Sequence, residues 1–276
     1  MSNWVSSVQG TLKRTVSGCN IQSMEFYESI SAHYDEIFPA SREAISFLDR
    51  RAGTHGRILD IACGTGGHAL GLSDLGHRVT GIDLDRTMIE RAKEKAEARD
   101  VQFYAGDMLG LGQVLRPYKK SGPVNFDLVY CIGNSIVHLS SHGEIARVLK
   151  DVSGLLDTGG HLVVQIVNYD RILRERIMEL PSLQSKTSGL LFKRAYDFKP
   201  GDGHVMFTTE LIVKESGEEK RIRNSIPLLI LTSDALKKLA AEAGFGEIAL
   251  FGSFDGSAYG DESFALILSA SKKSSR

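Results

Sequence analysis

Apolar and polar positions alternate along the chain in two distinct patterns, one helical and one strand-like. Helical spacing of apolar residues predicts helices at 41–51, 69–75, 86–99 and 144–156. Short runs rich in β-branched and aromatic residues predict strands at 57–61, 78–83, 101–104, 126–132 and 161–167. Strands that alternate with helices form a parallel sheet covered by helices on both faces. The pattern therefore predicts a doubly wound, mostly parallel α/β sheet.

The pattern changes after the fifth strand. Residues 189–196, 204–214 and 220–231 alternate between apolar and polar positions around glycine-containing turns, which predicts antiparallel hairpins. We interpret 171–231 as an antiparallel β insertion that covers the site as a lid. A helix capped by Thr232 or Ser233 and two closing strands at 245–251 and 263–270 complete a seven-stranded sheet.

The N-terminal part of the chain has a different character. Residues 1–23 are rich in serine and only weakly periodic, so we expect a flexible tail, with Met24 as an alternative start. From Met24 the run MEFYESISAHYDEIF has helical spacing. We therefore expect one domain over 24–276, whose segment 24–56 forms an N-terminal helical lid.

Composition and charge narrow the class of partner. The 276 residues are 42% hydrophobic and 24% charged, with a formal net charge of −1, so no overall field attracts nucleic acid or an anionic membrane. No apolar run reaches the roughly 20 residues that span a bilayer. Three cysteines without CxxC spacing favour a reducing, cytoplasmic location. We expect a small-molecule substrate, and the sequence is compatible with a homo-oligomer.

The candidate ligand site begins where the first predicted strand ends. Asp60 and Ile61 are followed by ACGTGG and then by a helix, and glycines at such a turn let backbone amides approach a nucleotide-like ligand. Gly64, Gly66 and Ala69 also fit the dinucleotide pattern GxGxxA, and Asp83 ends the next strand, where an acidic residue holds a ribose. An NAD(P)-dependent oxidoreductase is therefore one interpretation.

Further motifs favour a different ligand. An acidic residue before the glycine loop, the sequence GDM at 106–108 and the strand-end sequence CIGNSIVHL are not required by a dehydrogenase. A cofactor made of adenosine and an amino acid needs a carboxylate for its ribose diol, an acceptor for its adenine amine and polar partners for its ammonium group.

The motifs LDIACGTG, GIDLD, GDM and FDLVYCIGNSIVHL resemble, in order and spacing, those of class I S-adenosylmethionine-dependent methyltransferases over about residues 58–170. The resemblance implies a Rossmann-like fold, S-adenosylmethionine as cofactor and methyl transfer as the reaction. It implies that Asp83 binds the ribose hydroxyls, Asp107 the adenine amine and Met108 the adenine face. It places Asp60, Ala62, Gly64 and Gly66 at the methionine end, and adds Leu84 and Cys131 as cofactor contacts.

A narrower resemblance concerns the acceptor. CIGNSIVHL together with VNYDRIL at 167–173 is similar to the glycine N-methyltransferase group, which implies N-methylation of a small amine. In that group an arginine directly before the Asn-Tyr-Asp run holds the acceptor's carboxylate, whereas this chain has Val167. Glycine itself is therefore disfavoured as the acceptor.

Three residues are candidates for catalysis. Asn134 and His138 follow the fourth strand, so Asn134 is a candidate for orienting an acceptor amine, and His138 for accepting a proton or a hydrogen bond. Tyr34, with Tyr27 and Arg42 as further cofactor contacts, lies on a segment that folds over the donor in similar enzymes. The alternative interpretation is structural, with Asn134 in a loop, His138 as a helix cap and the tyrosines in the core.

Other chemistries lack sequence support. The eight histidines are dispersed without an HxxxH pair, so we predict no metal site. A GxSxG elbow is absent, and Cys63 fits a small residue packed under the glycine loop. A protein that binds S-adenosylmethionine without turnover is a further alternative to the enzyme.

Overall fold

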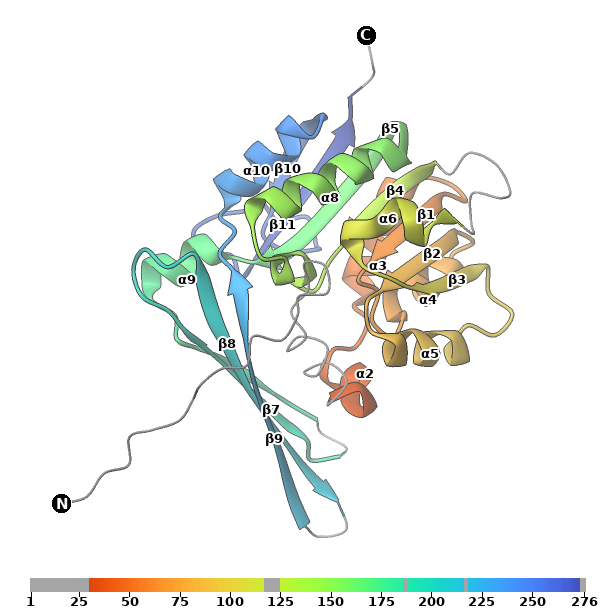
Figure 1. The fold of residues 1–276 in the computed structure, drawn as a ribbon. Coiled ribbons are helices and arrows are strands. Elements are labelled where there is room, and N and C mark those ends of the chain that lie inside the picture. Colours follow the sequence, from red (N-terminus) through yellow and green to blue (C-terminus); the bar gives the residue numbers. More distant parts are fainter. Residues whose placement is uncertain (1–29, 117–124, 186–187, 216–217, 274–276) are drawn as a thin grey trace, which may run out of the picture.

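The computed structural model describes residues 30–116, 125–185, 188–215 and 218–273 of the chain (Figure 1). The tail predicted at 1–23 and Tyr27 lie outside the described residues. Within the described ranges, no helix has the length and apolar character needed to cross a membrane.

A seven-stranded sheet forms the body of the molecule, with the strand order β10-β11-β5-β4-β1-β2-β3. Its strands are β1 (Arg57–Ile61), β2 (Arg78–Asp83), β3 (Val101–Ala105), β4 (Phe126–Cys131), β5 (Leu156–Val167), β10 (Phe245–Phe251) and β11 (Ala265–Lys272). The first five strands pair in parallel, whereas β11 pairs antiparallel with β5 and β10. The predicted Rossmann-like sheet with a closing hairpin is confirmed, and the carboxyl ends of its parallel strands meet at one edge.

Helices cover both faces of this sheet because successive residues of each strand point in opposite directions. On one face lie α3 (Arg42–Ala52), α4 (Gly67–Asp74) and α5 (Arg86–Lys95); on the other lie α8 (His142–Leu155) and α10 (Ser233–Glu242) (Figure 1). Leu128 and Tyr130 of β4 pack with α3, α4 and α5, while the alternate residues Val129 and Cys131 pack with α8 and α10. The sheet is therefore buried on both sides.

Short helices occupy the connections near the carboxyl edge of the sheet. They are η1 (Ser31–His33), α2 (Tyr34–Ile37), η2 (Met108–Gly110), α6 (Leu111–Val114), η3 (Ser135–His138) and α9 (Tyr169–Glu175). Helix α2 is a single turn, because Pro39 disfavours helical backbone at Phe38, which has φ −127° and ψ 67°. The lid expected at 24–56 is described only from residue 30, with α2 near the sheet edge and α3 packed against the sheet; its role as a lid stays a prediction.

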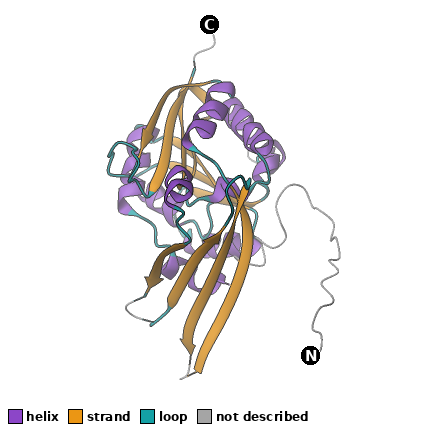
Figure 2. Cartoon of the chain, turned by 90° about the vertical axis from the view of Figure 1, so that its left-hand side faces the viewer, coloured by secondary structure: helices purple, strands orange, loops and turns teal. Residues whose placement is uncertain are grey.

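The antiparallel insertion forms a second sheet, here called sheet B, with the order β6-β7-β8-β9. Its strands are β6 (Glu179–Gln184), β7 (Leu191–Asp197), β8 (His204–Glu215) and β9 (Glu218–Leu229). Phe192 and Tyr196 of β7 are buried on the inner face with Leu211, whereas Lys193 faces outward with Glu210. Figure 2 shows sheet B extending from the α/β body as a long curved layer. The three predicted strands are confirmed, while β6 and α9 were not predicted.

Candidate active site

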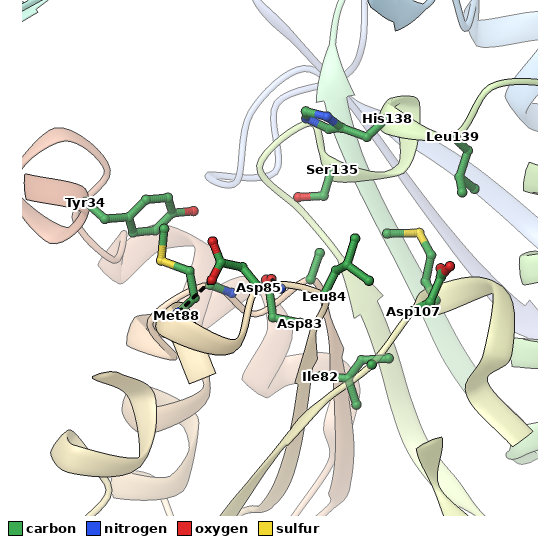
Figure 3. A pocket seen from close by; sticks show the side chains of 14 residues that line it. Tyr34, Ile82, Asp83, Leu84, Asp85, Met88, Asp107, Ser135, His138 and Leu139 are labelled. Atoms are coloured by element: carbon green, nitrogen blue, oxygen red, sulfur yellow. Dashed lines mark hydrogen bonds between the residues drawn. The ribbon is translucent and has the colours of Figure 1, made fainter. Parts of the chain in front are cut away.

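A cavity opens at the carboxyl ends of β1, β2 and β3, below η3 (Figure 3). Figure 3 shows Tyr34 and Met88 on one side, Asp107 on the other, and Ser135 and His138 above. The residues that line it are Tyr34, Ala62, Gly64, Ile82, Asp83, Leu84, Asp85, Met88, Gly106, Asp107, Met108, Ser135, His138 and Leu139.

Most of the residues singled out in the sequence meet in this cavity. The lining includes Tyr34, Ala62, Gly64, Asp83, Leu84, Asp107, Met108 and His138. Sequence reasoning missed the polar side chains Asp85 and Ser135 and the apolar Ile82, Met88 and Leu139. Asp85 and Met88 belong to GIDLDRTM and Ser135 to CIGNSIVHL, so their position in strand-end motifs was an available signal.

The glycine loop between β1 and α4 has a backbone that few residues can adopt. Gly64 and Gly66 have φ of 55° and 78°, and Ala62 has φ 61°. A Cβ atom on Gly66 would lie 2.5 Å from the ring of Phe103, which no side chain tolerates without movement. Ala62 adopts the left-handed conformation against the ordinary preference of a non-glycine residue, so the surrounding structure must hold it there.

Asp83, at the end of β2, is fixed by two backbone donors. Its Oδ2 accepts from the amide of Gly64 at 2.8 Å, and its Oδ1 accepts from the amide of Asp85 at 2.9 Å. Burial raises the pKa of Asp83 to about 6, although these amide bonds oppose the shift. Each carboxylate oxygen keeps acceptor capacity beyond its one backbone partner, so the group can receive hydroxyl donors from a ligand.

Asp85 and Asp107 each cap a helix at the cavity wall. Oδ1 of Asp85 accepts from the amides of Thr87 and Met88 at the start of α5, at 2.7 and 3.3 Å. Its Oδ2 is buried and has no hydrogen-bond partner among the described residues. Oδ1 of Asp107 accepts from the amide of Leu109 at 2.9 Å, which leaves Oδ2 of Asp107 as an acceptor at the cavity.

Asp60 lies beneath the cavity wall, outside its lining. Its Oδ2 accepts from the hydroxyl of Tyr130 at 2.6 Å, and the side chain is 3% exposed. Burial raises the pKa of Asp60 to about 8, the nearby charge of Asp83 adds to the shift, and the bond from Tyr130 opposes it. Gly66 and Cys131, which were also expected to touch the cofactor, are buried and do not line the cavity.

Asn134 turns away from the cavity, while His138 faces it. Oδ1 of Asn134 accepts from the amide of Val167 at 3.1 Å, and Nδ2 donates to the hydroxyl of Tyr169 at 3.4 Å. These bonds tie the loop after β4 to the end of β5, in agreement with the structural alternative for Asn134. Burial lowers the pKa of His138 to about 4, so its imidazole is neutral near pH 7.

Of the two described N-terminal candidates, Tyr34 faces the cavity and Arg42 does not. Tyr34 on α2 lines the cavity, and its ring would lie 3.0 Å from a Cβ atom on Gly64. Arg42 is exposed at the start of α3 and does not line the cavity. Among the residues that the structure describes, no three His, Cys, Asp or Glu side chains gather as metal ligands.

Comparison with known proteins shows that this chain is similar to methyltransferases. The family model described as "Methyltransferase domain" matches residues 58–160. The glycine/sarcosine N-methyltransferase of Aphanothece halophytica is 27% identical over 243 residues, which cover 86% of each chain. The glycine N-methyltransferase of Oryctolagus cuniculus is 34% identical over 128 residues, which cover 42% of each chain. The latter likeness is thus confined to less than half of the rabbit enzyme.

A solved structure is similar to this chain over most of its length. An S-adenosylmethionine-dependent methyltransferase from Clostridium acetobutylicum ATCC 824 superposes with a TM-score of 0.73 at 16% identity, covering 90% of this chain and all of that one. At 16% identity, this match shows a shared fold and nothing more.

The fold is Rossmann-like, and residues 58–160 match the methyltransferase domain model. The chain is an S-adenosylmethionine-dependent methyltransferase, an enzyme whose methyl donor is S-adenosylmethionine, and these likenesses support the class I type. This result favours the methyl-donor interpretation of the glycine loop over the dinucleotide interpretation.

Proposed function

We propose that this enzyme transfers a methyl group from S-adenosylmethionine to the nitrogen of a small amine. The observation that carries the proposal is the likeness to a glycine/sarcosine N-methyltransferase along 86% of both chains. The geometry is compatible with it, because polar and apolar groups that suit the donor and an amine line one cavity at the carboxyl ends of the strands.

We orient the donor by the polar groups of the cavity lining. Asp83 receives the ribose hydroxyls, and Asp107 receives the adenine amine while Leu84 and Met108 flank the ring. The lining suits these roles, since it combines Asp107 with the apolar Ile82, Leu84 and Met108.

The methionine end of the donor then lies at the glycine loop. Ala62 and Gly64 offer backbone polar groups there, and Tyr34 covers them. Asp60, Gly66 and Cys131 support this wall from beneath, and the orphaned Oδ2 of Asp85 offers one further acceptor for a donor hydroxyl.

The reaction depends on alignment of the amine with the methyl group more than on acid–base catalysis. S-adenosylmethionine supplies a methyl group already activated on a sulfonium, so the chain must align the amine lone pair with it and exclude water. A neutral imidazole has one acceptor nitrogen, and we assign to His138 a hydrogen bond from the amine N–H, which would fix the direction of the lone pair. The methylated ammonium afterwards loses its proton to solvent. Asn134 holds the turn that carries His138 by its bonds to Val167 and Tyr169.

The acceptor is best described as an amine other than glycine. Val167 stands where the glycine N-methyltransferase group has an arginine, and its side chain offers no charge to a carboxylate. Nucleic acid is not expected, because a net charge of −1 gives no overall attraction to a polyanion.

An acceptor panel tests the proposal. Purified enzyme with S-adenosylmethionine is offered glycine, sarcosine, amino sugars, alkylamines, alcohols and thiols, and products are followed by mass spectrometry. We expect a methyl group on the nitrogen of at least one amine, glycine among the poorest acceptors, and no product with Asp83→Ala. Methylation confined to alcohols or thiols would contradict N-methylation, and glycine as the best acceptor would contradict the inference from Val167.

A further inference from the structure

Helix α2 is tied to the donor side of the cavity through Asp35. Its Oδ1 accepts from the hydroxyl of Thr65, a residue of the glycine loop that is 2% exposed. Its Oδ2 accepts from Nζ of Lys95, the last residue of α5, at 2.8 Å. One carboxylate thus links α2 to two elements that build the donor site.

The same short helix is also tied to sheet B. The hydroxyl of Ser188, just before β7, donates to Oε1 of Glu36. The ring of Phe38 packs edge-on against Phe192 of β7 with centroids 5.7 Å apart, and it packs against Tyr34 at 5.3 Å. A line of three aromatic rings therefore runs from the inner face of sheet B to the glycine loop. Figure 1 shows α2 at the end of the α/β body nearest to sheet B.

We propose that α2 is a strap that couples donor binding to the position of sheet B, and that Asp35 is the positioning residue that holds Tyr34 over the donor. The inference rests on the donor site proposed above. A four-residue helix has no stability of its own, so α2 stays in place only through these contacts.

The coupling follows from the two-sided attachment. A donor that contacts Tyr34 stabilises the strapped state, and the strapped state carries Glu36 and Phe38 to their partners on sheet B. Weakening the strap lowers the fraction of binding-competent enzyme, and the apparent affinity for the donor falls in proportion to that fraction. Donor occupancy thereby fixes the position of sheet B, which we predict to cover the acceptor.

The first experiment measures donor affinity with S-adenosylhomocysteine by titration calorimetry. We expect Asp35→Ala to raise the Kd about 3- to 30-fold, since it removes two hydrogen bonds to a charged group that is partly exposed. Asp74→Ala is the matched control, because Asp74 is equally exposed, 55% against 57%, and pairs with Arg99 away from the cavity. The same rise in both variants, or no rise in Asp35→Ala, would overturn the proposal.

The second experiment measures hydrogen exchange with saturating S-adenosylhomocysteine. We expect the ligand to slow exchange at 188–196 as well as at 34–37 in the wild-type protein. Phe38→Ala, which cuts the aromatic line, should keep protection at the glycine loop and lose it at 188–196. Protection confined to the cavity lining in the wild type, or protection of 188–196 that survives in Phe38→Ala, would refute the coupling. No acceptor is used, so failure of the amine panel and failure of the strap are separate results.

Discussion

Burial sets the protonation of the three titratable side chains on which the donor and acceptor sites depend. The pKa of Asp83 is raised to about 6 and that of Asp60 to about 8, while that of His138 is lowered to about 4. Near neutral pH, Asp83 is mostly ionised and accepts hydroxyl donors, Asp60 is mostly protonated, and His138 is neutral. Each state suits the role proposed for the residue.

The shift at Asp83 predicts a pH dependence of donor binding. Only the ionised carboxylate accepts hydrogen bonds at both oxygens, so affinity for S-adenosylhomocysteine should fall as the pH drops through about 6. At pH 5 about one Asp83 in eleven is ionised, and the Kd should be about tenfold higher than at pH 7. Titration calorimetry across this range checks the prediction. Asp60→Asn should keep the dependence and Asp83→Asn should remove it; a dependence that persists in Asp83→Asn would point to another group.

The neutral state of His138 predicts a different profile for turnover. Since the pKa of His138 lies near 4, its protonation should add no inflection to kcat/KM between pH 5 and 7, and the profile should follow the acceptor's own amine. His138→Phe should lower kcat about 10- to 100-fold through loss of one hydrogen bond to the amine, with unchanged Kd for S-adenosylhomocysteine. An inflection near pH 6 that disappears in His138→Phe would instead identify a general base.

At the scale of elements, the junction between β1 and α4 depends on a glycine. Gly66→Ala places a Cβ atom 2.5 Å from Phe103 in a backbone with φ 78°, so we expect a loss of about 1–3 kcal/mol in the free energy of unfolding and weaker donor binding. Gly154→Ala, at an exposed position of α8 with open space around it, should raise that free energy by about 0.5–1 kcal/mol. Urea unfolding of both variants checks the sign; a stabilised Gly66→Ala would contradict the loop geometry.

The elements that the sequence predicted are those with a strong period. The buried strands of the seven-stranded sheet and the amphipathic helices α8 and α10 follow regular apolar spacing, so their existence was predictable. Strand β6 was not, because ELPSLQ contains a proline and pairs with β7 through an irregular register. Helix α9 spans only seven residues and depends on a cap, since Oδ1 of Asn168 accepts from the amide of Arg171.

The residues of the site were likewise predictable only in part. Asp83 and Asp107 reach the cavity because they lie at or just after the ends of parallel strands whose carboxyl ends share one edge of the sheet. The order of strands and motifs in the sequence is enough to predict this position. Asn134 lies in an equally suggestive motif but turns its side chain to Val167, which depends on its φ of 65°. Sequence spacing does not specify such an orientation, and it equally hides the unpartnered oxygen of Asp85.

At the scale of the whole molecule, the two sheets have different roles. The seven-stranded sheet presents the donor site at the carboxyl ends of its strands, and sheet B packs its apolar inner face into the same hydrophobic core as α8 and α10. Helix α2 contacts both parts. In this account, methyl transfer takes place in the cavity at the carboxyl ends of the parallel strands, and the cover that sheet B gives to the acceptor stays a prediction.

The donor site is the central claim, and calorimetric titration with S-adenosylhomocysteine tests it most directly. We predict micromolar binding to the wild-type enzyme, loss of binding in Asp83→Ala, and no comparable binding of NAD or NADP. Binding of equal strength in wild type and Asp83→Ala, or binding of a dinucleotide in place of S-adenosylhomocysteine, would contradict the account.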